Sequence, residues 1–95
     1  MVSVLIHHRV ADYDSWKRGY DAIMEGPLAS NVRAYRIWRG CDDPNLVILC
    51  ETYESREAVN ATFANPVLLE AIAATGVEMP SLRVDIADEV ASGKH

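Results

Sequence analysis

The sequence predicts one α+β domain whose elements follow the order β-α-β-β-α-β. Residues 33–53, RAYRIWRGCDDPNLVILCETY, are typical of a β-hairpin, because two apolar arms flank a turn rich in Gly, Asp, Pro and Asn. Apolar side chains recur at helical spacing after the first strand and again between the hairpin and the last strand. A length of 95 residues fits a single domain, residues 1–95, with a polar tail at 89–95.

The first strand and the first helix are predicted from local signals. Residues 2–10 form an apolar strand, and Asp12 has the position of an N-cap, whose carboxylate accepts from a backbone N–H two or three residues on. Gly26 and Pro27 end the helix, since Pro lacks the N–H donor. One stripe of the helix carries side chains at spacings of 3, 4 and 3 residues: Tyr13, Trp16, Tyr20 and Ile23.

The second half of the chain begins and ends its helices with equally clear signals. Ser55 is a candidate N-cap, and Asn65 followed by Pro66 restarts the helix, because Pro at the first helical position loses no hydrogen bond. Gly76 fits the left-handed residue that follows a helix. The last strand is predicted at residues 81–88. Pro27 and Gly76 should both lie outside regular helix.

The second arm of the hairpin is apolar at both parities, in the run LVILC at residues 46–50. A strand with one wet face alternates, so such a run requires cover on both faces. The chain's own helices can cover one face only. Its length leaves no second layer for the other face, and we therefore expect a homodimer through the helix-free face of the sheet.

The element order is the split βαβ pattern of ferredoxin-like folds. Right-handed crossovers give a four-stranded antiparallel sheet of order 4-1-3-2 with the helices on one face. Two such faces packed together would remove about 1,500 Å² or more from water, the size of a stable interface.

Composition excludes several partners. A net charge of −5 with a pI near 5.0 disfavours nucleic acid and anionic membranes, which need a basic face. No apolar run approaches the ~20 residues of a membrane span. The N-terminus lacks the pattern of a signal peptide, and Cys41 and Cys50 are expected as free thiols in the reducing cytoplasm.

Four stretches carry a resemblance to a known group of proteins: HRVADYDSWK at residues 8–17, DDPN at 42–45, LCETY at 49–53, and Asn65-Pro66. Together they resemble the dimeric α+β barrel superfamily, near the small bacterial antibiotic-biosynthesis monooxygenase-like and cyclase-like proteins. The resemblance extends over about residues 4–88 and implies the fold and a homodimer. The superfamily includes cofactor-free oxygenases, haem-degrading enzymes, lactone isomerases, polyketide cyclases and proteins without assigned activity, so fold alone does not select a reaction.

The predicted strand order brings basic and aromatic residues to one end of the sheet. His7 and His8 are the catalytic candidates, because imidazole titrates near neutrality and can act as a general base or acid. The alternative for either is a structural histidine bonded to backbone. Adjacent strand residues face opposite ways, so the two cannot share a metal, and no Cys, His or Asp spacing indicates a metal site. No cofactor is expected.

The ligand-binding candidates are Arg9, Tyr35, Arg36, Trp38 and Arg83. The arginines could hold an anionic or enolate oxygen. Their alternative is ion pairing across strands with Glu51 or Asp85. Trp16 and Tyr20, on the helical stripe, are expected in the core.

Two functions follow. The first is a cofactor-free monooxygenase or cyclase that removes a proton from a small aromatic or polyketide-like substrate. The second is a non-catalytic ligand-binding or assembly module. A cavity of several hundred Å³ lined by His and Arg favours the first, and a filled core with paired charges favours the second.

Overall fold

The computed structural model describes residues 1–95 and confirms the predicted element order and the four-stranded antiparallel sheet. Its order, β2-β3-β1-β4, is the predicted 4-1-3-2 read from the opposite edge, with β3 in the interior. The strands are β1 (Val2–Arg9), β2 (Ala34–Arg39), β3 (Leu46–Tyr53) and β4 (Arg83–Asp88). The helices are α1 (Tyr13–Glu25), α2 (Arg56–Phe63) and α3 (Pro66–Ala74), with 3₁₀ turns η1 (Pro27–Ala29) and η2 (Met79–Ser81).

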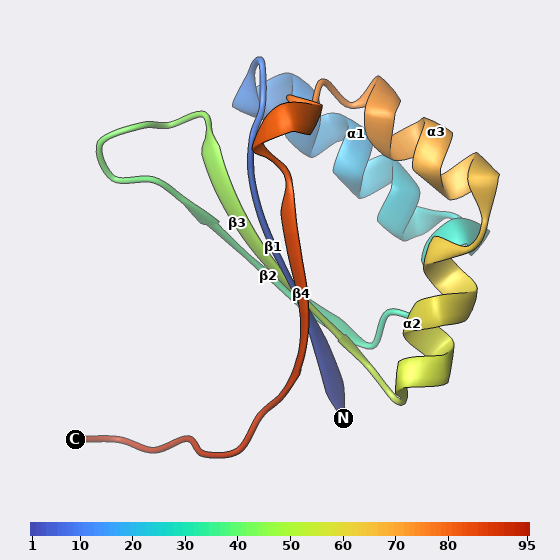
Figure 1. The fold of residues 1–95 in the computed structure, drawn as a ribbon. Coiled ribbons are helices and arrows are strands. Elements are labelled where there is room, and N and C mark those ends of the chain that lie inside the picture. Colours follow the sequence, from blue (N-terminus) through green and yellow to red (C-terminus); the bar gives the residue numbers. More distant parts are fainter.

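The helices all lie on one side of the sheet, and the other side is bare (Figure 1). The C-terminal tail leaves β4 on the side away from the helices (Figure 1). No helix is long and apolar enough to cross a membrane. The domain therefore has two layers, one of helices and one of sheet. The chain itself covers only one face of the sheet.

The predicted helix boundaries are confirmed by their caps. Asp12 accepts from the Ser15 N–H at 2.9 Å, Ser55 accepts from Ala58, and Asn65 accepts from Val67. Gly76 follows α3 with φ +91°, which an L side chain rarely adopts. Pro27 begins the 3₁₀ turn after α1, so it also lies outside α-helix, as expected.

The first and last strands differ slightly from prediction. β4 begins at Arg83 rather than at residue 81, because residues 79–81 form η2, where the Ser81 hydroxyl accepts from the Arg9 N–H at 2.9 Å. β1 ends at Arg9, and Val10 instead forms an isolated bridge with Val77.

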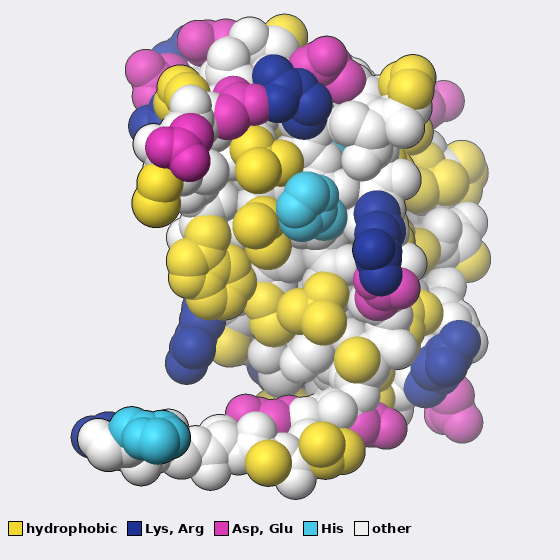
Figure 2. Space-filling view, turned by 60° about the vertical axis from the view of Figure 1, so that its left-hand side comes forward, with side chains coloured by type: hydrophobic (Ala, Val, Ile, Leu, Met, Phe, Trp, Pro, Cys, Tyr) yellow, Lys and Arg dark blue, Asp and Glu magenta, His cyan; other side chains and the backbone are white.

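Along β3, burial alternates strictly. Val47, Leu49, Glu51 and Tyr53 are buried against the helices, and the alternate residues, Leu46, Ile48, Cys50 and Thr52, are half-buried. The register extends this alternation across the sheet and defines the bare face. The bare face is formed by Ser3, Leu5, His7, Arg9, Ala34, Arg36, Trp38, Leu46, Ile48, Cys50, Thr52, Arg83, Asp85 and Ala87. Figure 2 shows hydrophobic side chains gathered over its middle with a histidine among them.

Candidate functional site

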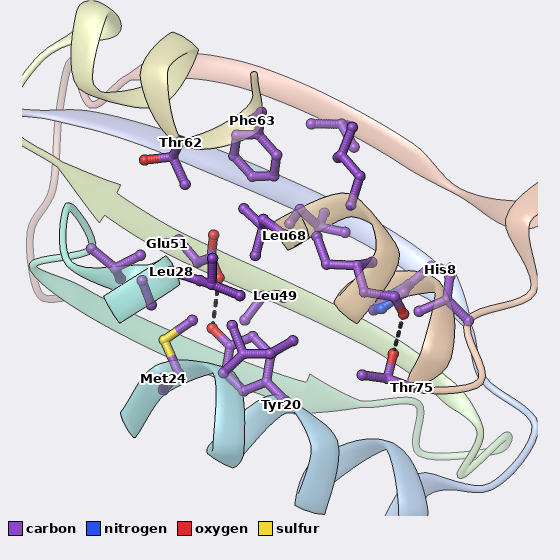
Figure 3. A pocket seen from close by; sticks show the side chains of 18 of the residues that line it. His8, Tyr20, Met24, Leu28, Leu49, Glu51, Thr62, Phe63, Leu68 and Thr75 are labelled. Atoms are coloured by element: carbon purple, nitrogen blue, oxygen red, sulfur yellow. Dashed lines mark hydrogen bonds between the residues drawn. The ribbon is translucent and has the colours of Figure 1, made fainter. Parts of the chain in front are cut away.

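A cavity of about 330 Å³ lies between the helices and the covered face of the sheet. Of its 22 lining residues, 18 are hydrophobic, and the remaining four are His8, Glu51, Thr62 and Thr75. The lining comes from β1, α1, β3, α2, α3, β4 and the segments that connect them, so it exists only in the folded chain. Such a concave apolar site with few polar groups has the usual form of a small-molecule pocket. Figure 3 shows its labelled side chains pointing inward from sheet and helices.

Glu51 is a buried carboxyl on β3, with 5% of its surface exposed. The Tyr20 hydroxyl donates to Oε2 at 2.7 Å, and the Tyr53 hydroxyl donates to Oε1 at 3.0 Å. Burial raises the pKa of Glu51, and the two tyrosine hydrogen bonds oppose that rise. Burial and the neighbouring carboxyl also raise the pKa of both tyrosines, so their hydroxyls stay protonated and act as donors.

His8, on β1, is buried, and its Nδ1 lies 3.1 Å from the Val47 carbonyl oxygen. A carbonyl only accepts, so Nδ1 carries the hydrogen and Nε2 has the free lone pair. Burial lowers the pKa of His8 below 6.5, and the nearby His7 lowers it further. No fully buried side-chain N or O atom of the protein lacks a hydrogen-bond partner. Nε2 makes no hydrogen bond, so it is not fully buried, and it is open to the cavity that His8 lines. At neutral pH this atom is a base.

His8 and Glu51 form opposite poles of the pocket. His8 pairs with Val47 in the sheet, and Glu51 follows Val47 by four residues on β3. At ~3.3 Å per residue, the two backbone positions are about 13 Å apart. Leu49 and Leu68 lie between the poles in Figure 3. The arrangement therefore offers two separate polar contacts to a single elongated ligand with an apolar body.

The other sequence-predicted site residues lie outside this pocket. His7 is on the bare face, in a row with Arg83, Ile48 and Trp38. Arg9 forms an ion pair with Asp43 of the hairpin turn, and Arg83 forms one with Asp85 of the same strand at 3.0 Å, so neither is a pair across strands.

A second, open groove of about 370 Å³ is lined by three of the candidates: Tyr35, Arg36 and Trp38. Arg36 and Trp38 lie on the bare face, whereas Tyr35 has the helix-side parity, opposite Glu51. Arg36 sits opposite Cys50 in the sheet. The Tyr35 ring makes an edge-to-face contact with Tyr20, with ring centroids 5.5 Å apart. Of the residues proposed from sequence, only His8 lines the pocket between the sheet and the helices.

Sequence reasoning missed the Glu51 cluster with Tyr20 and Tyr53. A signal existed, because Glu51 shares the buried parity of β3 with Val47, Leu49 and Tyr53, where a charged residue requires a partner. Trp16 and Tyr20 are core residues, as predicted, and their rings stack 5.1 Å apart. The same rings form one wall of the pocket. No three His, Cys, Asp or Glu side chains come together in a metal-binding group.

Comparison with known proteins identifies the fold. No family model and no curated protein matches the sequence. SnoaB, a cofactor-independent oxygenase from Streptomyces nogalater, superposes with a TM-score of 0.79 at 11% identity over 96% of this chain and 94% of that chain. An antibiotic biosynthesis monooxygenase has a TM-score of 0.74 at 17% identity, covering 96% and 100%. Rv0793 from Mycobacterium tuberculosis has a TM-score of 0.69 at 20% identity, covering 98% of each chain.

The chain therefore has the ferredoxin-like α+β fold of the antibiotic-biosynthesis monooxygenase-like proteins. This confirms, at the level of the fold, the resemblance found in the sequence.

Proposed function

We propose that the chain is a small enzyme that binds an aromatic, polyketide-like molecule in the helix-side pocket and begins its oxygenation by removing a proton. The observation that carries this proposal is His8, whose unprotonated Nε2 opens into an apolar cavity of about 330 Å³. The likeness of fold to SnoaB, a cofactor-independent oxygenase, supports the same class of chemistry.

His8 suits the role of general base. Its Nδ1–H is fixed by the Val47 carbonyl, which sets the tautomer and orients the ring. The Trp16 ring lies edge-on to the imidazole, with centroids 5.6 Å apart, and restricts its rotation. A positioned base typically contributes 10²–10⁴-fold to rate.

The proposed reaction needs no electron donor besides the substrate. Nε2 accepts a proton from a CH₂ group acidified by a neighbouring carbonyl and aromatic ring, which leaves a stabilised carbanion. The carbanion reduces O₂ directly; one oxygen atom becomes a carbonyl oxygen on that carbon, and the other leaves as water with the two hydrogens. The carbon loses four electrons and O₂ gains four, so the step balances. Cyclisation would share the same first proton transfer.

A binding module without turnover is the second candidate. The observation that favours it is that every fully buried side-chain N or O atom already has a hydrogen-bond partner, as in a purely structural core. Such a protein would bind the same molecules and release them unchanged.

Oxygen uptake with anthrone, whose CH₂ is acidified by a carbonyl and two rings, separates the two candidates. An enzyme should consume one O₂ per anthrone and incorporate one ¹⁸O atom from ¹⁸O₂. His8→Ala should reduce kcat at least 100-fold. His7→Ala is the matched control, because its side chain lies on the bare face, and it should retain activity. Binding in calorimetry without oxygen uptake would favour the module.

We also propose that two copies associate through the bare face. Leu5 and Trp38 are 40% and 46% exposed there, and Leu46, Ile48 and Cys50 add half-buried apolar surface. The ion pairs of Arg9 and Arg83 within this face reduce the charge that association would leave unpaired. A two-fold arrangement follows because one patch must complement itself. A cytoplasmic location stays a prediction from the cysteine usage.

A further inference from the structure

We propose that Glu51, held by Tyr20 and Tyr53, selects ligands that carry an uncharged hydroxyl donor and rejects ligands that carry a carboxylate. This inference deepens the proposed function and rests on it for the use of the helix-side pocket as the ligand site. It assigns the second polar pole of the pocket, opposite His8, to recognition of the substrate.

The charge of the pocket favours this assignment. Neither lysine nor arginine lines the cavity, and Glu51 is its only carboxyl. His8 is neutral at neutral pH, because burial lowers its pKa. An anionic ligand would enter a low-dielectric site with no cation to pair with, which is strongly unfavourable.

The hydrogen-bonding capacity of the lining points the same way. The hydroxyls of Tyr20 and Tyr53 donate to Glu51, and those of Thr62 and Thr75 donate to the backbone carbonyls of Ala58 and Ile72. The remaining imidazole N–H, at His8 Nδ1, donates to Val47. The indole N–H of Trp16 is therefore the one side-chain donor of the lining left without a partner.

Acceptors, by contrast, remain available. Each oxygen of Glu51 accepts from one tyrosine hydroxyl, the pattern of an ionised carboxylate, which offers about four acceptor positions and so keeps about two free. His8 Nε2 is a further open acceptor. A site rich in acceptors and poor in donors binds hydroxyl groups and disfavours carboxylates, which only accept.

The geometry assigns the two ends of the ligand. The tyrosines hold both carboxylate oxygens in fixed positions, so Glu51 can orient a phenolic hydroxyl at its pole. The reactive CH₂ would then lie near His8, within the span of about 13 Å that separates the poles along the sheet. The expected substrate is an uncharged fused-ring phenol with its acidic carbon at the end remote from the hydroxyl.

The test uses three ligands that share the naphthalene ring at pH 7, naphthalene, 2-naphthol and 2-naphthoate, measured by quenching of tryptophan fluorescence. With the wild-type protein, 2-naphthol should bind at least tenfold more tightly than either naphthalene or 2-naphthoate. Glu51→Gln should reduce the preference for 2-naphthol over 2-naphthoate at least tenfold. Glu54→Gln is the matched control, because Glu54 is exposed and pairs with Arg33 at 3.2 Å. It should leave the preference unchanged.

A second variant should change the ligand preference in the opposite direction, so the inference can still be tested if Glu51→Gln fails to fold. Tyr20→Phe frees one acceptor position on Glu51 and should raise the preference for 2-naphthol over naphthalene at least threefold. An unchanged preference in both variants, with thermal unfolding still cooperative, would overturn the inference. If no naphthyl ligand binds the wild-type protein, both this inference and the proposed function fail. If the ligand preference depends on Glu51 but the protein consumes no oxygen with anthrone, this inference stands and the proposed catalysis is rejected.

Discussion

His8 combines burial with an open basic nitrogen, and this combination has a consequence for the pH dependence of activity. In the proposed reaction the base must be unprotonated, and burial lowers the pKa of His8 from 6.5. The acidic limb of kcat/KM, which reports the free enzyme, should therefore have its midpoint below pH 6.5. Oxygen uptake measured from pH 4.5 to 8 provides the check. A midpoint at or above 6.5 would contradict the assignment of His8 as the base.

Glu51 should make stability depend on pH in the direction opposite to that of a salt-bridged carboxyl. Its folded-state pKa is raised by burial above the ordinary 4.5, so between these two values the folded state binds more protons than the unfolded state. Its contribution is thus fully present in acid and is lost as pH rises through the folded pKa. As pH rises through this window, the free energy of unfolding of Glu51→Gln should therefore increase relative to that of the wild-type protein.

Urea unfolding at intervals from pH 4 to 8 measures that difference. Glu54→Gln removes an exposed carboxyl from the same region and should show a much smaller change across the series. A constant gap between Glu51→Gln and wild type would show that the carboxyl titrates alike in the folded and unfolded states, contrary to the prediction.

At the scale of elements, α1 and α3 approach one another at Gly19. A Cβ at this position would lie 2.8 Å from Thr75 Cγ2, closer than atoms in real structures approach. In an open helical site, Ala would be favoured over Gly by about 1 kcal/mol. Here the overlap should reverse the sign, and Gly19→Ala should lower the free energy of unfolding by about 1 kcal/mol.

A double-mutant cycle tests this contact between helices. Thr75→Ser removes Cγ2 and keeps the hydroxyl that donates to the Ile72 carbonyl. In that background, Gly19→Ala should become stabilising, with both effects measured by urea unfolding. The same loss in both backgrounds would mean that the strain arises somewhere other than at Thr75.

The elements themselves were predictable from sequence because their signals are local. Asp12, Ser55 and Asn65 each bond a backbone N–H two or three residues away, so the pattern specifies both partners. The hairpin turn and Gly76 depend on backbone preferences in the same way.

The site was less predictable, because it depends on which face of the sheet each side chain occupies. The sequence suggested Glu51 and Asp85 only as ion-pair partners for the strand arginines. In the structure, Arg33 pairs with Glu54, and Asp85 pairs with Arg83 on the bare face. Glu51 points to the helices, where the partners come from α1 and from β3 itself. Such a cluster requires the register and the helix position together, and neither is encoded locally.

For the whole molecule, the unpaired sheet face leads to a prediction of mass. Sedimentation equilibrium at micromolar concentration should give about twice the 10.5 kDa of one chain. Leu5→Glu places a charge in the middle of the bare face, beside Cys50 and Asp85, and should shift the equilibrium to the monomer. A wild-type mass of one chain, with cooperative unfolding, would contradict the proposed dimer.

Val67→Glu is the matched control for that experiment. Val67 is 57% exposed in the first turn of α3, on the helix side, where a negative charge is compatible with the helix dipole. The mass should remain that of a dimer.

The strict alternation along β3 has a consequence for how the protein can change during evolution. Even and odd positions of this strand serve different surfaces, so substitutions at Leu49 can reshape the pocket while Ile48 continues to serve the opposite face. Length changes lack this freedom. One residue inserted or deleted inside β3 would turn every later side chain to the other face and expose Glu51 where apolar surface is needed. Related sequences should therefore vary freely by substitution in this strand and place their insertions in the hairpin turn between Arg39 and Leu46.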